Sequence, residues 1–353
     1  MCSAAWHQPE CPQSRRAKCL YAAATVVNLI GRVLHPWRRW IAASFALLAA
    51  SAAALDLQGH RGARGLAPEN SLASFERALK LGVTTLELDI AVTRDGVVVI
   101  HHDLALNPDI TRDANGRWLD APSAPVHSLD WAELQRFDIG RIKPGTRYAA
   151  QHPQQVPIDG TRIPRLTDLF ELVRRGGYER VRFAIETKLS PLQPDATLPP
   201  ERFAAVAVDE IRKAGLQQRV QIMSFDWRTL QAVQRLAPEI PTVYLSAQQR
   251  WHDNIGAQQP EGSPWTAGFQ FREHGSVPMM IKAAGGRFWS VYFGDVDAAK
   301  VREAQALGLK VLVWTVNDAP TMQRMLDLGI DGLITDRPDI AATVLRERRI
   351  EPR

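Results

Sequence analysis

The chain has 353 residues, of which 45% are hydrophobic and 23% charged, enough for one large globular domain or two ordinary ones. Its net charge of +5 resides in residues 1–54, whereas residues 55–353 carry 37 basic and 37 acidic side chains. This balance gives no basis for binding through counterion release, so no nucleic-acid partner is expected. All three cysteines precede residue 20, which excludes a disulfide, a thiolate nucleophile or a cysteine metal site from the rest of the chain.

Residues 1–54 are expected to be a leader. Arg38 and Arg39 precede a short apolar run at 41–48, and small residues follow up to Ala54. This order is typical of a signal peptide, here over about 37–54, and the residues before it are interpreted as an over-extended start. We therefore expect an exported, periplasmic protein, with an uncleaved N-terminal anchor as the alternative.

From residue 55 onward, apolar strand-like runs alternate with segments of helical periodicity. Residues 104–165 and about 247–275 contain turn signals with little periodicity and are interpreted as insertions. A hairpin strand is expected at 97–101. Apart from it, strands are expected at 56–59, 84–92, 181–187, 220–225, 242–245, 288–293, 311–316 and 332–334, and helices at 71–81, 166–175, 202–214, 227–236, 277–284, 297–307, 319–328 and from 339.

Strands that alternate with helices predict a parallel sheet, and eight such units in about 300 residues fit a (β/α)8 TIM barrel. Residues 55–353 would form this one domain, with insertions after the second strand and its hairpin and after the fifth strand. An open doubly wound sheet is the alternative. No G-x-G-x-x-G sequence follows the first strand, which removes one common form of that fold.

Polar residues gather where the expected strands end, and in a barrel these ends surround the active site. Glu87 and Asp89 lie two residues apart on one strand, as do Glu186 and Lys188 on another, so each pair shares a face. Taken alone, the second pair is explained equally well as an ion pair, and Asn70 as the cap of the next helix. Three carboxylates together form an all-oxygen site that suits one divalent cation, Ca²⁺ or Mg²⁺, better than Zn²⁺. Basic residues and histidines beside such an ion indicate a phosphate site with acid–base catalysis.

The order of these residues resembles a known family, the glycerophosphodiester phosphodiesterases. The similarity covers about 56–345, which is nearly all of the chain after the leader. The matching motifs are His60-Arg61-Gly62, Pro68-Glu69-Asn70, Glu87-x-Asp89, His102-Asp103, Glu186-x-Lys188, Ser224-Phe225-Asp226, Trp314-Thr315-Val316-Asn317 and the run from Asp331 to Asp336.

The resemblance implies metal-dependent hydrolysis of a small glycerophosphodiester to glycerol 3-phosphate and an alcohol. It favours His102 over its neighbour His101, because the family pairs this histidine with an aspartate. The implied roles are metal binding by Glu87, Asp89 and Glu186, acid–base catalysis by His60 and His102, and stabilisation of phosphoryl charge by Arg61 and Lys188; Glu69 would support the metal or Arg61, and Trp314 would form a wall of the pocket or part of the core.

Two other functions are compatible with these residues. A phospholipase-D-like or sphingomyelinase-D-like activity would need an apolar approach surface, for which Trp251, Trp265 and Phe269 are too few, and no membrane insertion of the mature chain is expected. A phosphate-binding barrel without turnover would show a broken motif, and the sequence has none. The sequence does not determine the metal, the head group, the acid or base role of each histidine, the oligomeric state, or whether water or the substrate's own 2-hydroxyl attacks.

Overall fold

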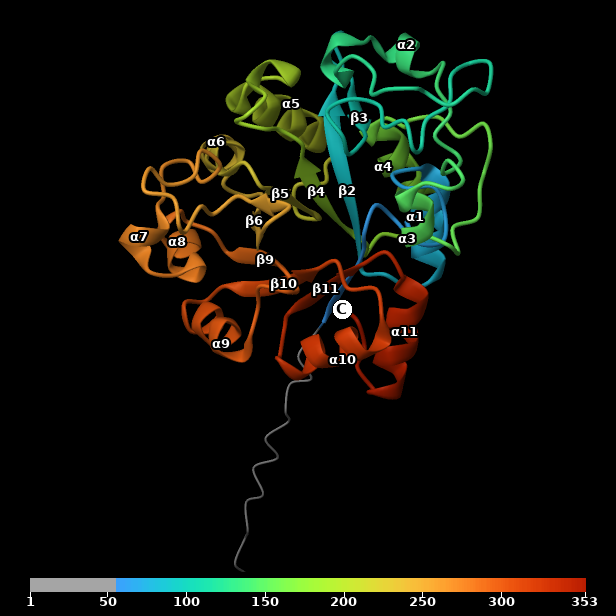
Figure 1. The fold of residues 1–353 in the computed structure, drawn as a ribbon. Coiled ribbons are helices and arrows are strands. Elements are labelled where there is room, and N and C mark those ends of the chain that lie inside the picture. The colour runs from blue at the N-terminus through green and yellow to red at the C-terminus, as the bar shows by residue number, and fades with distance from the viewer. Residues whose placement is uncertain (1–54) are drawn as a thin grey trace, which may run out of the picture. The chain divides into compact units, whose positions relative to one another are not determined.

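The strands of the computed structural model, which describes residues 55–353, follow one another around a closed ring (Figure 1). Each barrel strand pairs in parallel with the next barrel strand along the chain, and the last pairs with the first. Their residues are almost all buried, as expected where both faces of a parallel sheet are covered. The predicted (β/α)8 barrel is thereby confirmed. Its strands are β1 (Asp56–Gly59), β2 (Thr85–Val92), β4 (Arg182–Thr187), β5 (Val220–Ser224), β6 (Thr242–Ser246), β9 (Phe288–Tyr292), β10 (Lys310–Trp314) and β11 (Gly332–Thr335).

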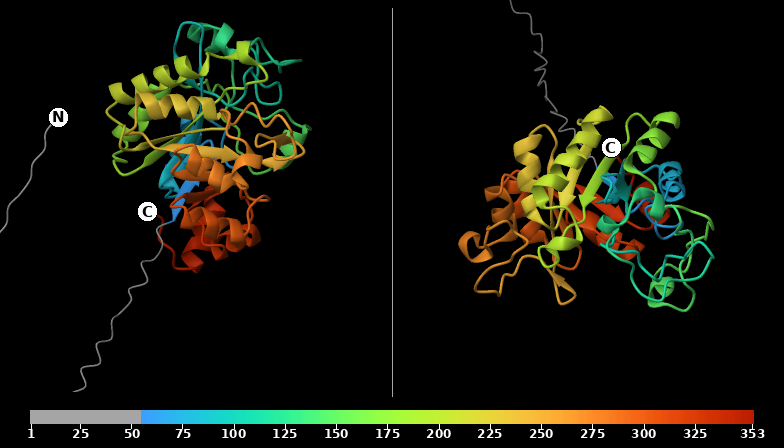
Figure 2. Two further views of the ribbon diagram at one scale, coloured as in Figure 1. Left: turned by 90° about the vertical axis from the view of Figure 1, so that its left-hand side faces the viewer. Right: turned by 90° about the horizontal axis from the view of Figure 1, so that it is seen from above.

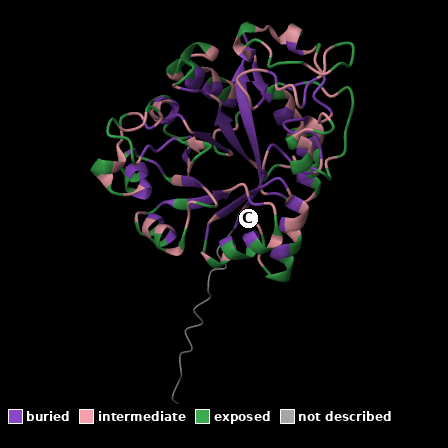
Figure 3. Ribbon diagram, viewed as in Figure 1, coloured by how far each residue is buried: buried purple, intermediate pink, exposed green. Residues whose placement is uncertain are grey.

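Helices surround the barrel and bury one apolar stripe each against it (Figure 3). In α4, for example, Leu166, Leu169, Phe170 and Val173 recur at the spacing of one helical face and are all buried. Inside the barrel a smaller apolar cluster, which includes Met223, fills the space below the strand ends. The surrounding helices are α1 (Leu72–Lys80), α4 (Leu166–Arg175), α5 (Pro200–Lys213), α6 (Trp227–Leu236), α8 (Val277–Ala283), α9 (Ala298–Ala306), α10 (Ala319–Asp327) and α11 (Pro338–Glu347).

Both predicted insertions are present, and they lie at the same end of the barrel (Figure 2). The first follows β3 (Val98–Ile100), which pairs antiparallel with β2, and it has a small apolar core of its own. The second follows β6, the fifth barrel strand. The short elements of the loops are η1 (Val126–Ser128), α2 (Trp131–Leu134), α3 (Arg147–Gln151) and η2 (Pro194–Ala196), then β7 (Gln248–Gln249), β8 (His252–Asp253) and α7 (Phe271–His274).

The predicted bounds of the barrel strands and helices differ from the observed ones by at most two residues, but one local assignment was wrong. Ser71, not Asn70, caps α1, because its hydroxyl accepts from the backbone N–H of Ser74 at 3.1 Å. Asn70 adopts a positive φ of 54°, which frees its side chain to reach β2 instead. Within residues 55–353 no helix is both long and apolar enough to cross a membrane. The predicted leader lies outside the described residues.

Candidate active site

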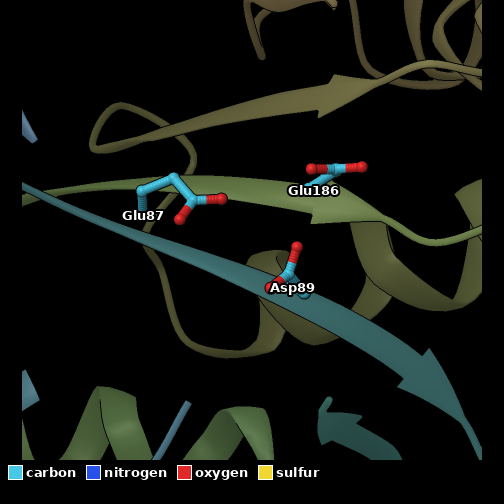
Figure 4. Close-up of side chains that lie close together, drawn as sticks. All are labelled: Glu87, Asp89 and Glu186. Atoms are coloured by element: carbon cyan, nitrogen blue, oxygen red, sulfur yellow. The ribbon is translucent and has the colours of Figure 1, made fainter. Parts of the chain in front are cut away.

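The three carboxylates predicted to bind a metal meet where β2 and β4 lie side by side (Figure 4). Glu87 and Asp89 point to the same face of β2, and Asp89 pairs in register with Glu186 on β4. One oxygen from each side chain lies within 4.8 Å of the others, and all three residues are buried. Spacing along one strand and register across two strands thus produce a compact cluster of hard oxygen donors.

The electrostatics of this cluster fit a divalent cation. Burial raises the pKa of Glu87 well above its ordinary value, and repulsion from Asp89 and Glu186 adds to the effect. Burial and Asp89 also raise the pKa of Glu186 to about 7, although Lys188 opposes them. Against the effect of burial, Lys188 and Arg61 lower the pKa of Asp89. Three buried carboxylates at this separation repel one another, and a hard dication relieves that repulsion.

Two basic side chains border the carboxylates. The Lys188 ammonium lies 2.6 Å from Glu186 Oε1 and 3.1 Å from Asp89 Oδ1. The Arg61 guanidinium pairs with Glu69 at 2.8 Å and with Asp89 at 3.2 Å, and its exposed fraction is only 8%. Of the two alternatives for Glu69, the observed contact is with Arg61. The side chains of Lys188 and Arg61 are therefore held in place before any phosphate arrives.

Each of the two predicted catalytic histidines rests on a carboxylate. His60 Nδ1 lies 2.6 Å from Asp336 Oδ1, and His102 Nδ1 lies 2.6 Å from Asp103 Oδ1. A carboxylate acceptor fixes the proton on Nδ1, so that Nε2 is left to exchange protons. Burial, and then Arg64, lowers the pKa of His60 to about 4. Burial, and then Arg61 and Lys188, lowers the pKa of His102 to about 4 as well.

These residues open onto a cavity of about 530 Å³ at the carboxyl ends of the strands. His60, Arg61, Glu87, His102, Glu186, Lys188 and Trp314 line it, whereas Asp89 and Glu69 lie behind this lining and contact Arg61. His102 faces the cavity; its neighbour His101 does not line it and lies 3.4 Å from the carbonyl oxygen of Ala105. The structure thus brings together every residue that the sequence proposed for the site.

Sequence reasoning gave no part in the site to four residues that hold it in place, which are Arg64, Asn70, Tyr148 and Asp336. Asp336 binds His60 and forms two hydrogen bonds with Arg64, at 2.9 and 3.0 Å. Its position directly after the last barrel strand is the feature of the sequence that could have indicated this role. Asn70 donates to Asp89 Oδ2 at 2.9 Å. Tyr148, in the first insertion, donates to Glu69, and no sequence signal connects the two.

A hard-metal and phosphate site at the strand ends of a (β/α)8 barrel places the protein among the barrel enzymes that act on phosphate esters. Within that class the comparison with known families is specific. Residues 60–340 match the model of the glycerophosphoryl diester phosphodiesterase family, and the chain belongs to this family.

Individual relatives agree with that assignment. The glycerophosphodiester phosphodiesterase of Caldanaerobacter subterraneus is 28% identical over 82% of this chain and 96% of its own length. A crystal structure of a candidate glycerophosphoryl diester phosphodiesterase from Silicibacter pomeroyi is 34% identical, with a TM-score of 0.75 over 85% of this chain and 95% of that one. An Oleispira antarctica phosphodiesterase, solved with its product sn-glycerol-3-phosphate, shares the fold at 23% identity and a TM-score of 0.60, over 83% of this chain and 97% of that one.

Proposed function

We propose that the protein hydrolyses glycerophosphodiesters to glycerol 3-phosphate and an alcohol. One observation carries the proposal: a cluster of three buried carboxylates, two histidines held by carboxylates, and the basic side chains of Arg61 and Lys188 gather at a single cavity. The family assignment and the activity named for the Caldanaerobacter relative support it. Glu87, Asp89 and Glu186 would hold one divalent cation, Ca²⁺ or Mg²⁺, which when bound neutralises the phosphodiester and polarises it toward attack.

Arg61 and Lys188 would bind the non-bridging phosphoryl oxygens. Both side chains line the cavity and are anchored by ion pairs with buried carboxylates, so they pay little conformational entropy when a phosphate binds. Negative charge grows on those oxygens during attack at phosphorus. The two fixed cations would therefore stabilise the transition state more than the bound substrate.

The histidines would move the protons. With Nδ1–H held by Asp336 or Asp103, each ring presents Nε2 to the cavity. One neutral imidazole accepts the proton of the attacking hydroxyl at Nε2, and the other, protonated on both nitrogens, donates its Nε2 proton to the departing alcohol oxygen. Both pKa values lie low while the site is without substrate, and the anionic phosphodiester raises them once it is bound. The same arrangement serves attack by water or by the substrate's 2-hydroxyl.

The test is a metal add-back assay on the full chain. Protein treated with a chelator is supplied with Ca²⁺ or Mg²⁺, and glycerol 3-phosphate released from glycerophosphodiesters is measured. We expect activity to return with one ion and to be lost in Glu87→Ala and His60→Ala. Glu76→Ala, an exposed glutamate on α1, is the matched control and keeps its activity. Folded protein that releases nothing with either ion contradicts the proposal, and lipid phosphodiesters are then the next substrates to assay.

We also propose that the protein is exported to the periplasm. The support is the signal-peptide pattern of residues 37–54. N-terminal sequencing of the protein from fractionated cells tests this directly. A mature N-terminus close to Leu55 in the periplasmic fraction is the expected result, and a chain beginning at Met1 in the cytoplasmic fraction contradicts it.

A further inference from the structure

The mouth of the cavity is divided into two chemically distinct halves. Its charged and titratable residues come from the ends of β1, β2 and β4, which are adjacent strands in the barrel, and from the loop after β3. The remaining arc, after β5, β6 and β10, contributes aromatic rings. We call this set the aromatic wall, and it consists of Phe225, Trp251, His252, Trp265 and Trp314.

Most ring pairs in the aromatic wall pack edge to face, whereas Trp251 and His252 stack, with centroids 6.1 Å apart and an interplanar angle of 23°. Phe225 lies 4.7 Å from His252 and 5.4 Å from Trp314, measured between ring centroids, with interplanar angles of 88° and 83°. His252 lies 5.2 Å from Trp265, and Trp251 lies 6.2 Å from Trp314. Perpendicular packing leaves ring faces, where the π electrons are concentrated, available to a ligand in the cavity.

The second insertion holds this wall in position. Buried Asn254 accepts from the backbone N–H of Ala247 at 2.9 Å and donates to the carbonyl of Leu245 at 3.0 Å. These bonds tie the β7–β8 hairpin, which carries Trp251 and His252, to the end of β6. A wall fixed before the ligand arrives loses little entropy on binding.

The wall offers a ligand mainly π faces. The indole N–H of Trp314 is already used, since it donates to the carbonyl of Ser290 at 3.2 Å. Burial, and then Lys188, lowers the pKa of His252, so this ring is neutral and does not repel a cation. A group that needs no hydrogen-bond partner and gains from negative π faces therefore suits this wall.

We propose that the aromatic wall binds the trimethylammonium group of a choline ester, so that the preferred substrate is glycerophosphocholine. This inference rests on the proposed function, because it assumes that the phosphate lies on Arg61 and Lys188. A quaternary ammonium has no N–H to satisfy and is attracted to aromatic faces. In phosphocholine only two carbons separate it from the phosphate oxygen, which suits a wall in the same cavity as the phosphate residues.

Other head groups fit the wall less well. A primary ammonium, as in ethanolamine, brings three N–H donors that lose water and find ring carbons in its place. Glycerol and inositol carry hydroxyls that would likewise lose their hydrogen bonds to water. An alkyl chain gains from any apolar surface but not from π faces in particular, so charge is the property that separates it from choline.

The test compares three glycerophosphodiesters on the metal-loaded full chain. Their head groups are choline, ethanolamine and 3,3-dimethylbutanol, which has the shape of choline without its charge. We expect kcat/KM for choline to exceed that for the neutral analogue by about tenfold. The double substitution of Trp251→Ala with Trp265→Ala should reduce that ratio to about two or less. Trp251→Phe, which keeps a π face, should preserve most of it, as should Trp118→Ala, a tryptophan of the other insertion that does not line the cavity.

Equal kcat/KM for choline and the neutral analogue in the unsubstituted protein would overturn the trimethylammonium site while leaving the proposed hydrolysis intact. A preference for choline that survives the double substitution overturns it too. If no diester is hydrolysed, the proposed function fails, and calorimetric titration with phosphocholine and its neutral analogue still decides the binding site. Tighter binding of phosphocholine that depends on Trp251 and Trp265 supports the wall; equal binding refutes it.

Discussion

Loading the metal-free protein with a divalent cation at pH 6 should expel protons from the carboxylate cluster. Burial and mutual repulsion raise the pKa of Glu186 to about 7 and raise that of Glu87 well above its ordinary value. At pH 6 a group of pKa 7 is about nine-tenths protonated, and at pH 8 only about one-tenth. A bound cation requires both glutamates as carboxylates. We therefore expect the release from Glu186 to fall from about nine-tenths of a proton per cation at pH 6 to about one-tenth at pH 8, and Glu87 adds to the release at pH 6.

The neighbouring groups do not obscure this release. His60 and His102, whose pKa is about 4, are already neutral at pH 6, and Asp89 is already ionised because its pKa is lowered. The protons released on binding therefore come from the glutamates. Each proton makes the apparent binding constant about tenfold weaker for every pH unit below the pKa of its group.

Isothermal titration calorimetry measures the release when the titration is repeated in two buffers with different ionisation enthalpies. The difference between the two observed enthalpies gives the number of protons transferred to the buffer. Glu186→Gln should lower that number by about one at pH 6 and weaken binding, whereas Glu76→Gln on α1 should change neither. If binding at pH 6 releases no protons, Glu87 and Glu186 are not protonated in the metal-free protein, and the reasoning is refuted.

Two substitutions test residues that hold the site, and a third tests the cap of α1. Asp336→Asn should lower kcat on the order of 10²-fold or more with the fold intact, because an amide can donate to His60 Nδ1 and so stabilise the wrong tautomer. Asp339→Asn on α11 is the control, and an unchanged kcat in Asp336→Asn contradicts the role of Asp336. Tyr148→Phe removes the hydroxyl that contacts Glu69 and should raise KM about two- to tenfold, which substrate-saturation curves measure; an unchanged KM would leave the first insertion without a part in the site. Ser71→Ala removes the cap of α1 and should lower the free energy of unfolding by about 1 kcal/mol, as urea titrations measure. A loss below about 0.3 kcal/mol would rule the cap out as a source of stability.

The fold and most of the site could be predicted from sequence because both depend on local patterns. Alternating strand and helix periodicities imply parallel strands, and parallel strands bring their carboxyl ends to one rim. The spacing of Glu87 and Asp89 puts both carboxylates on one face of a strand, whatever surrounds it. The capping error at Asn70 shows the limit of such reasoning, since Ser71 beside it is an equally good cap and only the contact with Asp89 distinguishes the two.

The sequence by itself determined the strand and helix order, the barrel, the paired carboxylates and the family motifs, because each is written in residues that are close together in the chain. Tertiary structure alone decided which residues, distant in sequence, hold the side chains of the site in place. Closure of β11 onto β1 brings Asp336 to His60 across 276 residues, and folding of the first insertion brings Tyr148 to Glu69 across 79. The aromatic wall likewise forms only when the second insertion folds back over the strand ends. Spacing in sequence contains no information about such contacts, since they depend on the path of the whole chain in space.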